Sequence, residues 1–137
     1  MATNYKAIAK KLKFEGRAFI NGKYVNAIDG KKFETINPAT GEKLCSVAKC
    51  NHKDVNLAVK VSRKAFNSGV WSKSSPEYRK EVLLKFAELL RKAGDENSVL
   101  ECVDTGKLIA DCINEVANDA PMHFQWYGEL IDKVFGK

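Results

Sequence analysis

Apolar and polar positions follow a strand-like pattern in the first third of the chain and a helical pattern afterwards. Phe19 and Ile20 are followed by Asn21-Gly22, a pair typical of a two-residue hairpin turn because both residues tolerate positive φ. Further turns are predicted at Asp29-Gly30 and from Asn37 to Gly41, and further strands at Tyr24-Val25, Phe33 to Ile36 and Lys43 to Ala48. This part of the sequence therefore predicts a short β-meander.

Helical spacing begins after Cys50. Asn51 is predicted to cap a helix ending near Gly69, and Ser75 a second helix with Pro76 at its first position. A third helix is predicted from Asp95 to Val103, closed by Gly106, and a fourth from Ile109 to Phe135, kinked or broken at Pro121. The predicted inward stripe of the first helix is Val55, Ala58, Val59, Ser62, Ala65 and Phe66, and the apolar side of the fourth includes Ile113, Val116, Ala120, Tyr127, Leu130, Ile131 and Val134.

The predicted fold class is therefore α+β, a short antiparallel meander followed by three or four helices. Three segments are expected: a basic tail or short helix at 1–17, the meander at 18–50 and a helical part at 51–137. Two or three short strands are marginally stable alone, because a small sheet needs another layer to bury its face. The pattern thus favours a part of a larger fold.

The positive charge is concentrated near the N-terminus. The chain has 137 residues and a net charge of +6, and residues 1–23 hold six basic residues against Glu15, a local charge of +5. Within this tail Tyr5, Ile8, Ala9 and Leu12 recur at helical spacing. We expect a short amphipathic helix that docks on its own protein or is solvated, in preference to one that binds membrane or nucleic acid.

The apolar runs of the chain and the spacing of its cysteines both bear on the cellular compartment. No apolar run approaches the roughly 18 residues that span a bilayer, and Lys10, Lys11 and Lys13 stand where a secretory signal needs an apolar core. The four cysteines have irregular spacing, which predicts reduced thiols rather than a zinc knuckle or a disulfide scaffold. Cys50 with His52, and His123, are interpreted as structural rather than metal-binding. We therefore expect a cytoplasmic protein.

Several short motifs occur together in a characteristic order. They are Phe19-Ile20-Asn21-Gly22, Glu34-Thr35-Ile36-Asn37-Pro38, Leu100 to Lys107 with its Asp104-Thr105-Gly106-Lys107 ending, and Trp126-Tyr127 to Gly136. In order and spacing, from about Phe19 to Gly136, the chain resembles the opening segment of the NAD(P)-dependent aldehyde dehydrogenases. The nearest branch is that of the aminoaldehyde enzymes, such as the γ-glutamyl-γ-aminobutyraldehyde and betaine aldehyde dehydrogenases.

The resemblance implies an α/β enzyme fold of which this chain is an N-terminal part. The family's catalytic cysteine, catalytic glutamate and nucleotide-binding turn all lie downstream of Lys137, so no catalytic or cofactor-binding residue is assigned here. Gly16, Gly22, Gly30 and Gly41 are too far apart to form a dinucleotide turn. Cys102 lies beside Glu101 and near Asp104, acidic neighbours that disfavour a thiolate nucleophile.

Two sites follow from the resemblance, residue by residue. The family holds a monovalent cation, K⁺ or Na⁺, with carbonyl and carboxylate oxygens, which match Thr35, Ile36 and Asp104 here; the alternative is that Asp104 is only a helix-terminal turn residue. Aminoaldehyde enzymes carry acidic residues near the substrate entrance, and Glu115 matches one position, the alternative being a solvated carboxylate. The other position is Asn118, with Asp119 adjacent. Trp126 and Tyr127 are interpreted as core or interdomain packing.

Two functions are expected from this reading. The first is an N-terminal fragment, inactive alone, whose parent oxidises an aldehyde to a carboxylic acid with NAD or NADP and forms a homo-oligomer. The second is a non-enzymatic interaction module derived from such an enzyme. Binding to nucleic acid ranks last, since the basic tail is accompanied by no aromatic platform. The sequence does not choose between NAD and NADP or name the aldehyde.

Overall fold

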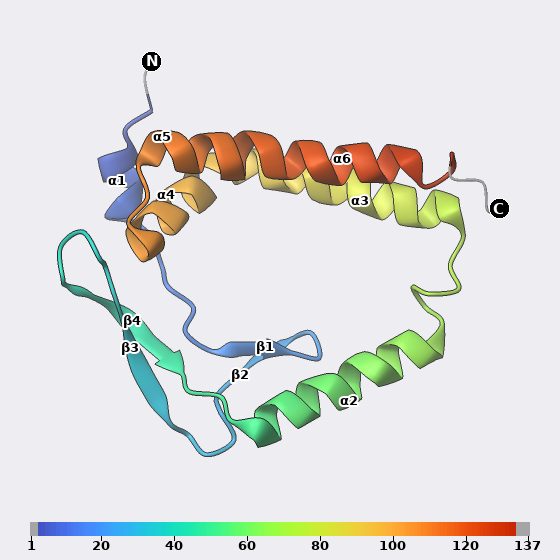
Figure 1. The fold of residues 1–137 in the computed structure, drawn as a ribbon, viewed down its shortest axis with the longest axis horizontal. Coiled ribbons are helices and arrows are strands. Elements are labelled where there is room, and N and C mark those ends of the chain that lie inside the picture. The colour runs from blue at the N-terminus through green and yellow to red at the C-terminus, as the bar shows by residue number, and fades with distance from the viewer. Residues whose placement is uncertain (1–2, 134–137) are drawn as a thin grey trace. The chain divides into compact units, whose positions relative to one another are not determined.

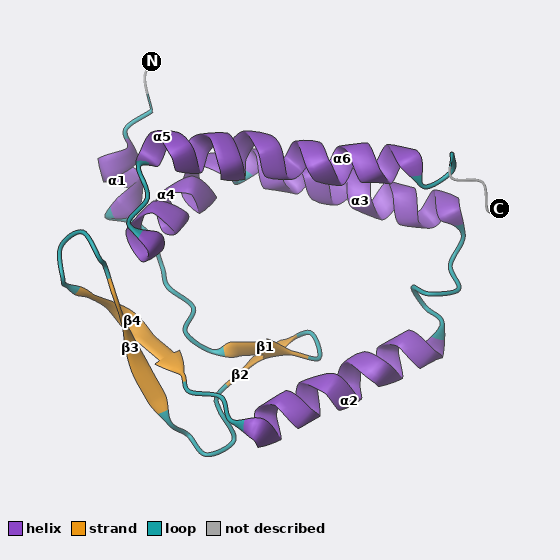
Figure 2. Ribbon diagram, viewed as in Figure 1, coloured by secondary structure: helices purple, strands orange, loops and turns teal. Residues whose placement is uncertain are grey.

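The computed structural model describes residues 3–133, in which a short N-terminal helix is followed by two hairpins. Strands β1 (Ala18–Ile20) and β2 (Lys23–Val25) pair antiparallel, and β3 (Lys32–Ile36) pairs antiparallel with β4 (Lys43–Ala48). The φ angles of Asn21 and Gly22 are 56° and 73°, as the predicted hairpin turn requires. The strands form two separate two-stranded sheets rather than one meander (Figure 2). A turn closed by the Gly30 N–H and the Ala27 carbonyl, 2.8 Å apart, lies between β2 and β3.

Helix α2 (His52–Ser68) follows the second hairpin and has the predicted ends. The Asn51 side chain accepts a hydrogen bond from the Lys53 N–H at 2.8 Å, and Asp54 accepts one from the Asn51 N–H at 2.9 Å. Gly69 ends the helix in the left-handed conformation, with φ at 80°. Together with both hairpins α2 forms one compact unit, Lys13–Lys73.

The predicted inward stripe of α2 is wrong in this structure. Val55, Val59 and Phe66 are exposed, Phe66 with 59% of its surface accessible. Of the predicted stripe, Ala58 is partly shielded from solvent; the helix also directs Asp54 and Val61 away from solvent, and among these three only Asp54 is buried. Helical periodicity identifies an apolar face but does not say what covers it.

The remaining helices belong to the second compact unit, Met1–Leu12 with Ser74–Lys137. They are α1 (Tyr5–Ala9), α3 (Pro76–Lys92), α4 (Gly94–Thr105), α5 (Ile109–Cys112), the π-helix η1 (Ile113–Asp119) and α6 (Ala120–Leu130). Helices α3 and α6 lie side by side (Figure 1), and a Cβ at Gly128 would stand 3.1 Å from the Leu83 Cβ. The absence of a side chain at Gly128 therefore lets the two helices approach closely.

The predicted fourth helix has a π-helical middle rather than a simple kink. Ala120 donates its N–H to the carbonyl of Glu115, five residues back, as a π-turn requires. Pro121 lies immediately after this segment and is fully buried. Because proline has no N–H and its ring displaces the carbonyl four residues back, a widened turn before Pro121 accommodates it without ending the helix. The predicted end at Phe135 lies outside the described residues.

The basic tail contributes the short helix α1, capped by the Asn4 side chain through the Ala7 N–H at 3.0 Å. This helix packs against α4, so the expected docking of the tail on its own protein is found. Among the helices of residues 3–133, none is both long and apolar enough to cross a membrane.

The mixture of helices and small antiparallel sheets confirms the predicted α+β class. The predicted segments 1–17, 18–50 and 51–137 were defined by whether strands or helices were expected. The two compact units are defined by contacts between residues, so they do not test the predicted segments, which stay a prediction. Buried side chains are mostly small, as at Ala87, Ser98 and Cys112.

Candidate functional site

The last turn of α4 and the corner after it carry the Asp-Thr-Gly-Lys motif, residues 104–107. Gly106 adopts φ 77° and donates its N–H to the Cys102 carbonyl at 3.0 Å, which ends the helix as predicted. The Cys102 thiol donates to the Lys107 carbonyl at 3.1 Å, and the Lys107 N–H donates to the Thr105 hydroxyl at 3.4 Å. The backbone of Lys107 is therefore held on both sides of its Cα atom.

The Lys107 side chain joins two carboxylates from different elements. Its ammonium nitrogen lies 2.6 Å from Glu115 Oε2 on η1 and 3.5 Å from Glu101 Oε1 on α4. The hydrogen bond with Glu115, followed by the interaction with Glu101, raises the pKa of Lys107 above its ordinary value. The substrate residue predicted at Glu115 is thus paired with a cation from its own chain.

The π-helix sets the position of Glu115. On its inner side Ala117 meets α4 where Gly94 has no side chain: a Cβ there would stand 2.9 Å from the Ala117 Cβ. The buried hydroxyl of Ser98 donates to the Cys112 carbonyl at 3.2 Å, directly before the π-segment. One close approach and one buried hydrogen bond thus fix η1 against α4.

The other residues near the predicted substrate position lie on the same helical stretch. Asn118 and Asp119 are exposed on η1, and the Asp119 carbonyl is 2.8 Å from His123 Nδ1. Trp126 and Tyr127 each expose 62% of their surface, so within this chain they are not core residues, contrary to the first of the two predicted roles. A role in interdomain packing stays a prediction.

The predicted cation ligands fall in two separate units. Thr35 and Ile36 lie in β3, where a bulge interrupts the pairing with β4 between these two residues. Asp104 lies in the last turn of α4, in the other unit. The cation site therefore stays a prediction. Nowhere in residues 3–133 do three or more His, Cys, Asp or Glu side chains form a group able to hold a metal ion.

The two cysteines near the corner, Cys102 and Cys112, are not placed to act as nucleophiles. Cys102 is engaged as a hydrogen-bond donor, while Cys112 is fully buried and its burial raises its pKa. A thiol nucleophile needs a stabilised thiolate within reach of substrate. The structure provides neither condition at Cys112, and it engages the Cys102 thiol with a backbone carbonyl.

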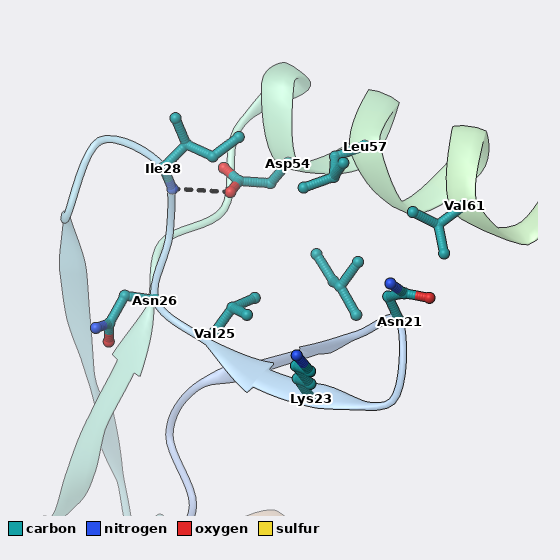
Figure 3. A pocket seen from close by; sticks show the side chains of 9 residues that line it. Asn21, Lys23, Val25, Asn26, Ile28, Asp54, Leu57 and Val61 are labelled. Carbon is teal, nitrogen blue, oxygen red and sulfur yellow. Dashed lines mark hydrogen bonds between the residues drawn. The ribbon is translucent and has the colours of Figure 1, made fainter.

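A cavity of about 250 Å³ lies between the first hairpin and α2 (Figure 3). Its apolar lining includes Val25, Leu57 and Val61. The Asp54 carboxylate, 3% exposed, accepts the Ile28 N–H at 2.8 Å on its rim. Both oxygens of Asp54 are used by backbone donors, so this carboxylate holds the turn after β2 to the start of α2 rather than offering a base.

The sequence analysis did not identify Lys107 as the partner of Glu115, or Glu101 as the second carboxylate that Lys107 contacts. Lys107 was available as the last residue of the motif that was interpreted for Asp104 alone. The signal that could have found it is the turn itself, since Gly106 reverses the chain and brings the next lysine back toward the preceding helix.

Comparisons with known proteins all lead to one family. The model of the aldehyde dehydrogenase family matches residues 24–137. Aminoacetaldehyde dehydrogenase of Pseudomonas aeruginosa is 42% identical over 131 residues, which cover 96% of this chain and 26% of that protein. The NADP/NAD-dependent aldehyde dehydrogenase PuuC of Escherichia coli is 40% identical over 129 residues, with 94% of this chain and 26% of PuuC covered.

The fold is shared with solved structures of this group. The crystal structure of the aldehyde dehydrogenase KauB from Pseudomonas aeruginosa superposes with a TM-score of 0.93 and 42% identity, over 97% of this chain and 27% of KauB. The chain thus spans about a quarter of the length of the relatives that it matches.

Proposed function

Because the chain belongs to the aldehyde dehydrogenase family, we propose that it forms the N-terminal part of an enzyme that oxidises an aldehyde to a carboxylic acid with NAD or NADP. The observation that carries this proposal is the agreement with KauB, which extends over 97% of the chain at a TM-score of 0.93. Aminoaldehydes are the proposed substrate class, in line with the names of the relatives.

The residues described here supply scaffold rather than redox chemistry. A dinucleotide turn joins a parallel strand to a helix, whereas both sheets of residues 3–133 are antiparallel hairpins. These residues therefore do not fit the cofactor, which would accept the hydride elsewhere in the proposed enzyme. Together with the engaged Cys102 and buried Cys112, this supports the proposal that the chain alone is inactive.

Two accessory roles are part of the proposal. Thr35, Ile36 and Asp104 contribute oxygen ligands to a monovalent cation, K⁺ or Na⁺, once the rest of the enzyme fixes the two units. Glu115 attracts the cationic end of an aminoaldehyde, since a partly exposed carboxylate raises the local concentration of cations. A homo-oligomer is the proposed assembly, because most soluble oligomers are symmetric assemblies of one kind of chain.

The test uses the protein as its native cells make it. The product is isolated with an antibody against the segment 13–73, its intact mass is measured, and aldehyde-dependent reduction of NAD and NADP is assayed. We expect a mass well above 15.3 kDa and reduction of at least one cofactor. A product of 15.3 kDa without activity would overturn the enzyme proposal.

A non-enzymatic interaction module is the second candidate. It is favoured by an unusual run of exposed apolar side chains on α3, namely Val82, Phe86 and Leu89, which line one groove. Such a surface on a stable protein marks a binding face. A native product of 15.3 kDa that unfolds cooperatively and is isolated with a stoichiometric partner would support this candidate over the first.

A further inference from the structure

The face of the first hairpin that is turned toward α2 carries a lysine among apolar side chains. Ile20 and Lys23 pair directly across the two-residue turn, and Val25 follows two positions later, so these three side chains lie on one face of the hairpin. Together with Leu57 and Val61 of α2 this face lines the cavity of about 250 Å³ (Figure 3). The cavity therefore has apolar walls and an ammonium group on its hairpin side.

The Lys23 ammonium group has no carboxylate partner in the part of the chain that the structure describes, because it takes part in none of the ion pairs within residues 3–133. The Asp54 carboxylate also lines the cavity, but it is 3% exposed and accepts the N–H groups of Asn51 and Ile28. Its oxygens are thus already engaged by backbone donors. A ligand that carries its own negative charge would supply the partner that Lys23 lacks.

We propose that this cavity binds a short-chain aliphatic carboxylate, with the alkyl chain between the hairpin and α2 and the carboxylate beside Lys23. The exposed carboxamides of Asn21 and Asn26 stand on the rim and can donate further N–H groups to the same oxygens. A volume of about 250 Å³ corresponds to about eight water-sized atoms, and hexanoate has about eight non-hydrogen atoms. An apolar cavity with a few polar groups at its mouth is typical of sites for such small amphipathic molecules.

Other ligand chemistries fit the lining less well. A cationic ligand would be repelled by Lys23, and Asp54 could attract it only by giving up its backbone donors. A sugar or nucleotide would place hydroxyl groups against Val25, Leu57 and Val61, whose side chains offer no hydrogen bonds in return. The apolar walls and the cation together therefore favour an alkyl carboxylate.

The walls of the cavity are held in place by contacts within one compact unit, Lys13–Lys73. On the opposite face of the hairpin Phe19 and Tyr24 pack edge to face, with ring centroids 5.1 Å apart. The turn after β2 is fastened to α2 by the 2.8 Å hydrogen bond from the Ile28 N–H to Asp54. The inference therefore depends neither on the second unit nor on the proposed enzyme.

The test is the binding of hexanoate to the 137-residue chain, followed by NMR at low salt. The matched neutral probe is 1-hexanol, which has the same alkyl length and no charge. Amide and methyl shifts of residues 20–28 and 54–61 are recorded during each titration. We expect saturable shifts there and tighter binding of hexanoate than of 1-hexanol. Lys23→Met should weaken hexanoate binding about two- to fivefold, with little change for 1-hexanol.

The matched control is Lys60→Met. Lys60 lies on α2, is exposed and does not line the cavity, so its replacement removes the same charge from the same compact unit. If Lys60→Met weakens hexanoate binding as much as Lys23→Met does, the effect is one of net charge and the proposal is overturned. Unchanged hexanoate binding in Lys23→Met overturns it as well.

A cavity-filling variant tests the site without changing any charge. Val61→Phe places ring atoms in the cavity and should abolish the binding of both probes, and an unshifted Ile28 amide would show that the turn stays joined to Asp54. Undiminished hexanoate binding in a folded Val61→Phe chain would overturn the proposal. So would hexanoate shifts confined to residues 81–89, which would place the probe in the α3 groove instead. An inactive native product would contradict the proposed function and leave this binding result unaffected.

Discussion

Gly94 on α4 and Ala117 on η1 approach so closely that a Cβ at position 94 would lie 2.9 Å from the Ala117 Cβ and 3.3 Å from its Cα. Neither atom belongs to a flexible side-chain end, so the helices must separate to accept a methyl group. This contact is where the π-segment rests on the preceding helix. The contact also helps to place Glu115, which lies on η1 two residues before Ala117.

We expect Gly94→Ala to lower the free energy of unfolding by about 1–3 kcal/mol, the usual cost of overpacking. Alanine improves helix propensity by up to about 1 kcal/mol, and less at the first position of a helix, so the steric term wins. Urea unfolding monitored by circular dichroism measures the change. Glu96→Ala, at an exposed position in the same turn, should have little effect, and an equally stable Gly94→Ala chain would show that the contact is looser in solution.

The Asp54 carboxylate joins the start of α2 to the turn between β2 and β3, accepting the N–H groups of Asn51 and Ile28. Asp54→Ala leaves both donors without this acceptor in a partly buried place, which we expect to cost about 1–3 kcal/mol. Urea unfolding again measures the change in the free energy of unfolding. Lys53→Ala, at the exposed neighbouring position, serves as the control, and a loss in Asp54→Ala no larger than that of the control would contradict the role of the carboxylate.

The ionisation of Asp132 should make the contact between the start of α3 and the residues after α6 depend on pH. Its hydrogen bonds with Lys80 and then Lys133 lower the pKa of Asp132 from 3.8 to about 2. Because the folded value is depressed, the stabilising contribution is complete above the ordinary pKa and is lost as the pH falls from about 4 to about 2.

The carbon-13 shift of the Asp132 carboxyl during an acid titration checks this pH window. In Lys80→Met the midpoint should move up toward 3.8, since the largest cause of the shift is gone. A midpoint already near 3.8 in the unaltered chain would mean that the 2.8 Å pair between Lys80 and Asp132 does not persist in solution.

Exposed apolar residues on α3 should make the isolated chain self-associate. Val82, Phe86 and Leu89 line one groove, and a contiguous apolar surface of this kind is uncommon on stable monomers. Leu89→Glu should shift the distribution in sedimentation velocity toward monomer, because it places a charge within the apolar stripe. Lys85→Glu, at the edge of the groove, is the control. A chain that is monomeric before any substitution would contradict this expectation.

Helix ends were readable from the sequence because their signals are local. Asn51 and Gly69 bound α2, Ser75 and Pro76 begin α3, and Gly106 ends α4, in each case through a backbone requirement of a single residue. The hairpin at Asn21-Gly22 was predictable for the same reason. Register and turn type follow from two positive φ angles.

The π-segment and the ion pair were not readable in this way. The apolar pattern of a helix is the same in the sequence whether or not one of its turns has widened to a π-turn. Only Pro121 indicated that the helix from Ile109 would be irregular. Lys107 and Glu115 are eight residues apart across a corner, a separation for which no helical or strand spacing predicts contact. The exposure of Val55, Val59 and Phe66 likewise depends on what covers them, which periodicity does not contain.

The docking of α1 on α4 has a consequence for the order in which the chain can fold during synthesis. The unit Lys13–Lys73 is continuous, so all of its contacts are available once that stretch has left the ribosome. The tail before it, in contrast, finds its partner only after α4 has been made, more than eighty residues later. Until then its basic amphipathic turn lacks the helix against which it packs. A segment that is made before the unit Lys13–Lys73 is thus placed after it.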